Sequence, residues 1–205
     1  MSFFDDTKNA GLALYIAAIL SIIGAILLIV CAFVDDDMKE DDIGWAIQGV
    51  GDLICGFIML GFGKMIKSGE LSDKFDIVTR FVMVVAMVTI IGGIFTAISC
   101  IGFDDKGAVA GSGIVSIIIG LIIYFIYTKI TNDSVGTFDR IMWIILLVIF
   151  VIMIILNFLA LFGAFGYDGA LAIVVALISA ICGIIIYIFM TIFMLDGDVK
   201  AKFGM

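Results

Sequence analysis

Residues 171–194 read LAIVVALISAICGIIIYIFMTIFM and contain no charged side chain. An apolar run of about 18 or more residues is long enough to cross a bilayer as a helix. Five further runs of this kind occupy most of the chain, over residues 11–34, 43–66, 80–103, 109–130 and 141–165. The sequence therefore predicts an all-α integral membrane protein, a six-transmembrane-helix bundle that forms a single membrane domain over residues 1–205.

The composition excludes several classes of function. The chain is 64% hydrophobic and only 15% charged, whereas about a quarter of the residues of a soluble domain are charged. It has no basic patch, so we expect the lipid bilayer, and no nucleic acid, as its surroundings. It has no His and no nucleophile–base or phosphate-loop motif, so we expect neither an enzyme, nor a metal site, nor a cofactor.

Four cysteines, Cys31, Cys55, Cys100 and Cys182, all fall within apolar runs and form no C-x-x-C pair. Free Cys packs as a small apolar residue, and this is the favoured interpretation of all four. A disulfide between Cys31 and Cys100, which are expected near the same membrane face, is the alternative that sequence leaves open.

The basic residues indicate the orientation of the chain. Of its eleven Lys and Arg, all except Lys39 and Lys106 lie at the N-terminus, in the second and fourth connections, or after the sixth span. Lys and Arg near helix ends favour the cytoplasmic side. We therefore predict a multi-pass protein of the cell membrane with both termini in the cytoplasm. The acidic first connection, residues 35–42, is interpreted as a solvated loop, with weak Ca²⁺ binding as the alternative.

A repeated string points to internal duplication. The pattern Ser-x-x-x-Gly-x-Ile-Ile-Tyr-x-x-x-Thr occurs at residues 116–128 and again at residues 179–191. The distance from Asp76 to Gly120 is 44 residues, as is the distance from Asp139 to Gly183. We therefore predict three two-helix repeats, with a cytoplasmic tail after them. The units are approximately residues 4–66, 75–130 and 138–194, and the tail is 195–205.

Small residues follow a four-residue spacing on the second, fourth and sixth spans. Gly56, Gly120 and Gly183 lie at the centre of these stripes. Small residues allow membrane helices to approach closely, which predicts that these three helices form the inner layer of the bundle. The odd-numbered helices would then face lipid. The alternative is that the small residues are simply scattered.

Asp52 is the sharpest functional signal in the chain. It lies nine residues after Ile43, which places it about 14 Å into its helix and near the midplane of a hydrocarbon core about 30 Å thick. Gln48 is one turn away, and Ser116 and Ser179 occupy the matching positions of the other two stripes. These four residues form a candidate proton or cation site. The alternative is that Asp52 is a protonated or amide-bonded packing residue.

Two functions remain in competition at this point. We expect first a non-catalytic structural or interaction subunit that forms a homo- or hetero-oligomer within the membrane. The alternative is a small proton- or cation-linked transporter or channel that uses Asp52. A cavity at Asp52 would favour transport, whereas a sealed carboxyl with a hydrogen-bond partner would favour packing.

Overall fold

The computed structural model describes residues 3–34, 41–130, 137–166 and 170–205. Most of the acidic loop, with the Ca²⁺ alternative raised for it, lies outside the described residues. The fourth connection, at residues 131–136, and the turn at residues 167–169 also lie outside them.

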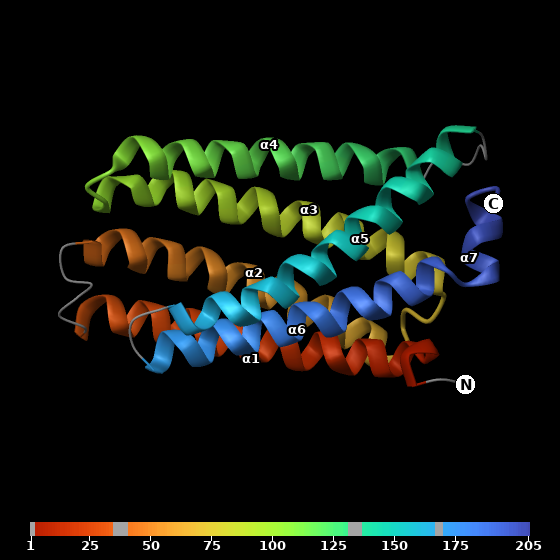
Figure 1. Ribbon diagram of the computed structural model, residues 1–205, viewed down its shortest axis with the longest axis horizontal. Helices are drawn as coiled ribbons and strands as arrows, with labels where there is room; N and C mark the ends of the chain where they lie inside the picture. Colours follow the sequence, from red (N-terminus) through yellow and green to blue (C-terminus); the bar gives the residue numbers. More distant parts are fainter. Residues whose placement is uncertain (1–2, 35–40, 131–136, 167–169) are drawn as a thin grey trace.

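Six long helices make up nearly all of the described chain, as predicted. They are α1 (Thr7–Val34), α2 (Asp42–Ser68), α3 (Lys74–Ser99), α4 (Lys106–Ile130), α5 (Thr137–Gly163) and α6 (Ala170–Met194). Each is long and apolar enough to cross a membrane, so the chain has the structure of a multi-pass membrane protein. Short helices are η1 (Phe3–Asp5), η3 (Cys100–Gly102), η4 (Ala164–Gly166) and α7 (Gly197–Lys202). Both termini lie at one end of the bundle, here called the terminal end, and the other is the far end (Figure 1).

The polar connection between α2 and α3 shows why these helices stop and start where they do. Gly69 ends α2 in the left-handed conformation, with φ of 81°, which glycine adopts without steric cost. Four residues later, the Asp73 carboxylate accepts a hydrogen bond from the backbone nitrogen of Asp76 and caps the start of α3. Local sequence therefore fixes this sharp reversal between two antiparallel spans.

Consecutive helices pack as three hairpins, α1–α2, α3–α4 and α5–α6. In the first hairpin, three glycines spaced by seven residues, Gly49, Gly56 and Gly63, face α1. A Cβ on Gly56 would lie 2.7 Å from Cγ1 of Ile22, and a Cβ on Gly63 would lie 2.7 Å from the backbone nitrogen of Tyr15. A seven-residue repeat keeps one seam of a helix against its partner, so α1 and α2 approach closely along their length.

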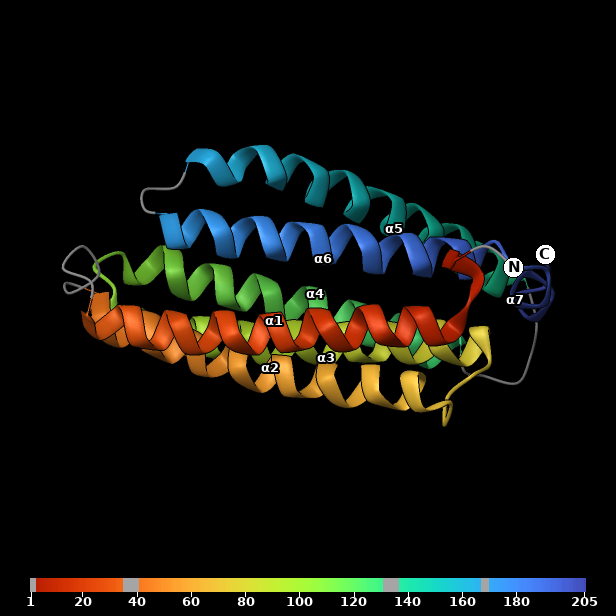
Figure 2. The same cartoon turned by 90° about the horizontal axis from the view of Figure 1, so that it is seen from below.

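The layering of the helices corrects the prediction that the even-numbered helices form the inner layer. Helix α3 buries nine residues, among them Phe81 and Gly93, whereas α4 buries only Gly113, Gly120 and Ile130. Gly120 faces Ile90 of α3, and Gly183 faces Asn157 of α5. The small residues of α4 therefore serve its own hairpin and leave the rest of the helix on the outside of the bundle. Figure 2 shows α5 and α6 lying along one side of the other four helices.

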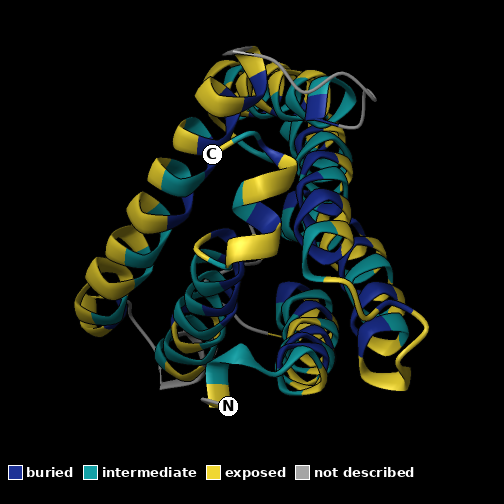
Figure 3. Ribbon diagram, turned by 90° about the vertical axis from the view of Figure 1, so that its right-hand side faces the viewer, coloured by how far each residue is buried: buried dark blue, intermediate teal, exposed yellow. Residues whose placement is uncertain are grey.

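The apolar core is concentrated toward the terminal end. Large, fully buried side chains there include Phe81, Phe189, Phe193 and Met194. Residues 195–205, predicted as a tail, instead include α7, which packs through the buried side chains of Val199 and Phe203. Figure 3 looks onto this end and shows α7 lying across its middle. Helices therefore meet in a shared core at one end, whereas toward the far end the hairpin glycines dominate the packing.

Candidate functional site

Asp52 does not pack against a neighbouring helix. Its side chain is exposed and lines a cavity of about 220 Å³ that is otherwise formed by α1 and α6. The walls of this cavity include Ser21 and Leu28 on α1 and Ser179 on α6. The predicted carboxyl at the midplane therefore faces a hollow between three helices.

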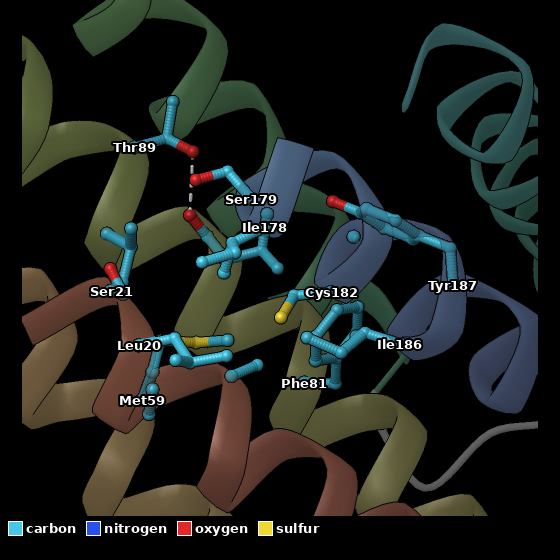
Figure 4. A pocket seen from close by; sticks show the side chains of 15 residues that line it. Leu20, Ser21, Met59, Phe81, Thr89, Ile178, Ser179, Cys182, Ile186 and Tyr187 are labelled. Atoms are coloured by element: carbon cyan, nitrogen blue, oxygen red, sulfur yellow. Dashed lines mark hydrogen bonds between the residues drawn. The ribbon is translucent and has the colours of Figure 1, made fainter. Parts of the chain in front are cut away.

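A second cavity, of about 320 Å³, adjoins the first and extends toward the terminal end. The two share four lining residues, Leu20, Ser21, Ile178 and Ser179. Thr89 on α3 also lines the second cavity. Figure 4 shows Thr89 and Ser179 on different helices with their hydroxyl groups turned toward one another. The two hollows therefore form one polar-to-apolar space, here called the joined cavity.

The second cavity has an aromatic end. Phe81 and Tyr187 line it, and their ring centroids are 5.8 Å apart. Phe150 lies 5.9 Å from Phe81 and 6.0 Å from Tyr187, again between ring centroids. These three rings come from three different helices, and they form the boundary between the joined cavity and the core of the terminal end.

Three polar groups at the joined cavity lack partners. Among the described residues, Asp52, Ser21 and Ser179 make no hydrogen bond or ion pair. Hydroxyl groups in helices commonly bond a carbonyl of the preceding turn. Thr89 does so, with its hydroxyl donating to the carbonyl of Val85 at 2.7 Å. Unpartnered polar groups in apolar surroundings are costly, so this cluster is suited to receive a ligand.

The structure separates the four predicted site residues. Asp52 and Ser179 line the same cavity, as predicted. Gln48, by contrast, donates from Nε2 to the Ser99 hydroxyl at 3.1 Å and so joins α2 to α3. Ser116 donates to the Ser112 carbonyl within α4 at 3.0 Å and lines neither part of the joined cavity. Including Gln48 and Ser116 was therefore wrong, because the matching repeat positions do not converge.

Ser21 and Thr89 were missed by sequence reasoning. Ser21 is the only serine or threonine within the predicted first span, residues 11–34. A lone hydroxyl in an apolar run was the available signal. Thr89 lies on α3, a helix that was expected to face lipid, so that expectation concealed it.

The chemistry open to the joined cavity follows from its donor atoms. Within the described part of the chain, no three His, Cys, Asp or Glu side chains gather as metal ligands. All four cysteines are described and are free thiols, so the disulfide between Cys31 and Cys100 is not formed. One carboxyl and neighbouring hydroxyls are suited to hold a proton or a single positive charge.

A charged cluster holds the terminal end together outside the apolar core. The Lys74 ammonium contacts the carboxylate of Asp5 at 2.5 Å and that of Asp196 at 2.6 Å. The hydrogen bond from Lys74 lowers the pKa of Asp196 below its ordinary value, although burial acts in the opposite direction. This terminal joint ties the segments before α1, at the start of α3 and after α6. No protein-family model matches the chain, and neither does a curated protein or a solved structure.

Proposed function

We propose that the protein is a small transporter of the cell membrane that binds a proton or a cation at Asp52. The observation that carries this proposal is an unpartnered carboxyl lining a cavity among membrane-spanning helices. A charge at this depth costs at least about 3 kcal/mol on insertion scales. A proton or a bound cation removes that cost, and both compete for the same carboxylate.

That competition provides a simple means of coupling. When a cation occupies the carboxylate, the proton must leave, and when the proton returns, the cation is released. Ser21 and Ser179 are placed to supply further oxygen or hydroxyl contacts to whichever group is bound. The positive-inside pattern supports cytoplasmic termini, which would place the aromatic end of the joined cavity toward the cytoplasm. The matching helix-facing positions of Gly56, Gly120 and Gly183 support an origin from three two-helix units.

The transport proposal can be tested with purified full-length protein in sealed vesicles. A pH gradient is imposed across the membrane, and proton flux is followed with a pH-sensitive dye while Na⁺ or K⁺ is supplied on one side. We expect flux in the wild type, loss of flux in Asp52→Asn, and unchanged flux in Asp104→Asn. Asp104 is a matched control because it is exposed in the turn before α4. Equal flux in all three proteins, or flux in none, would reject the proposal.

The second candidate is a non-catalytic subunit of a membrane assembly. The outward surface of α4 favours it, since Ile118, Leu121, Ile122 and Phe125 are all exposed. Such a surface contacts either lipid or another membrane helix. Cross-linking through a cysteine at Ile118, in a chain without its native cysteines, distinguishes these: a cross-linked dimer in native membranes at low expression supports assembly. A chain that stays monomeric under those conditions rejects self-assembly through α4.

A further inference from the structure

We infer that the joined cavity binds a small amphipathic organic cation, such as an alkylammonium or arylammonium ion. This inference rests on the proposed function and names its substrate class. It follows from a division of chemistry along the cavity. The only carboxyl lies at one end, unbonded hydroxyls lie at the junction, and apolar and aromatic side chains enclose the other end.

The carboxyl end selects charge. Neither part of the joined cavity is lined by Lys or Arg, and Asp52 forms no ion pair among the described residues. A single ammonium group would balance an ionised Asp52. A buried charge that is paired in this way costs much less than an isolated one. The cavity therefore accepts a ligand with one positive charge and disfavours an anion.

The composition of the walls disfavours a bare metal ion as the preferred occupant. Ca²⁺ takes six to eight oxygen ligands, whereas the side-chain oxygens of polar residues here come from Asp52, Ser21, Ser179, Thr89 and Tyr187. The hydroxyl of Thr89 already donates to a backbone carbonyl. An organic ammonium needs one counter-charge and otherwise apolar contact, which this cavity provides.

The aromatic end fits the apolar body of such a ligand. Met59, Val85 and Val88 line the second cavity together with Phe81 and Tyr187. Its volume of about 320 Å³ is at the lower end of the range of small-molecule sites, about 300–1,000 Å³. The cationic head would lie beside Asp52 and the body between the rings, with Ser21 and Ser179 at the junction. A benzyl group on a trimethylammonium head has this form.

Equilibrium dialysis of radiolabelled benzyltrimethylammonium against the full chain in detergent tests the inference. We expect saturable binding of about one ion per chain, and at least a tenfold lower affinity for Asp52→Asn. Asp52→Glu keeps the charge and should bind, and Asp104→Asn should match the wild type. The uncharged carbon isostere of the probe should not compete. Absence of saturable binding, equal binding by Asp52→Asn, or full competition by the isostere would overturn the inference.

A second variant guards against misfolding of Asp52→Asn. Ser179 is exposed in the cavity, so Ser179→Leu fills the junction while leaving Asp52 in place. It should block the probe, whereas unchanged binding would place the ligand elsewhere and overturn the inference. Circular dichroism of each variant establishes that it is folded.

Vesicle flux separates failure of the inference from failure of the proposed function. If the probe binds through Asp52 but neither protons nor the probe cross the membrane, the ligand class stands and transport is rejected. If flux of protons with Na⁺ or K⁺ depends on Asp52 while the probe neither binds nor inhibits it, transport stands and the organic cation is rejected.

Discussion

Replacing Gly113 with Ala tests whether close backbone approach holds the hairpins together. A Cβ at this position would lie 2.6 Å from the carbonyl oxygen of Gly93 and 2.8 Å from Cα of Ala97. Both neighbours are backbone atoms of α3, so neither can turn aside as a flexible side chain would. Two residues earlier, a Cβ on Gly111 would meet nothing within 4 Å. Gly111→Ala is therefore a matched control in the same helix.

The magnitude follows from the distances. Carbon atoms in favourable contact are about 3.5–4.0 Å apart, so α3 and α4 must separate locally by about 1 Å. Overpacking of this kind typically costs about 1–3 kcal/mol. Both variants gain about 1 kcal/mol because Ala favours the helix over Gly. That gain cancels in the comparison, so Gly113→Ala should be less stable than Gly111→Ala by about 1–3 kcal/mol.

Unfolding by SDS in mixed micelles, followed by tryptophan fluorescence, measures this difference. Trp143 reports on the packing of α5 against α6, because its indole nitrogen donates to the Met194 carbonyl at 2.8 Å. Trp45 reports on α2 through its edge-on contact with Phe103. Equal midpoints and slopes for the two variants would refute the reasoning, since the steric overlap would then have no energetic consequence.

Three further predictions concern the terminal joint, the contact between α2 and α3, and orientation. Asp196→Asn should lower the unfolding temperature at pH 7, and the difference from wild type should vanish as pH falls below about 4: the lowered pKa of Asp196 stabilises the fold above its unfolded value of about 3.9 and is lost as pH falls through the folded one; a difference that persists at pH 3 would contradict this. Gln48→Leu should lower the free energy of unfolding by about 0.6 kcal/mol, a typical value for a hydrogen bond between membrane helices, and a loss above about 2 kcal/mol in the same SDS titration would show that Gln48 does more than bond Ser99. In intact cells, an impermeant thiol reagent should label Lys106→Cys and not Glu70→Cys, and the reverse pattern would invert the proposed orientation.

Hydropathy predicted the spans well but not the ends of the helices. The third span was expected from residue 80, whereas α3 begins at Lys74. Hydropathy marks the part of a helix that lies in lipid, while helical hydrogen bonds continue into the polar region. Asp73 and Gly69 were the local signals for the true ends.

The four-residue stripes predicted the wrong contacts because each glycine serves its own hairpin. A seven-residue spacing, visible in Gly49, Gly56 and Gly63, carries the pairing of α2 with α1. The depth of Asp52 follows from its position in an apolar run, and its neighbour Ser179 was found by the repeat. Ser21 and Thr89 join them only through the way separate helices meet, which residue spacing within one helix does not encode.

The terminal joint has a consequence for the order in which the protein is made. Its charged members, Asp5, Lys74 and Asp196, are separated by most of the chain, and Phe203 packs on Phe75 with a ring-centroid distance of 5.4 Å. A ribosome must therefore translate all six spans before the first residues of the protein find their permanent partners. Until then, each hairpin can insert and pack through its glycines, but the end of the bundle that carries Asp5 stays open. Completion of translation and closure of the bundle are thus a single event.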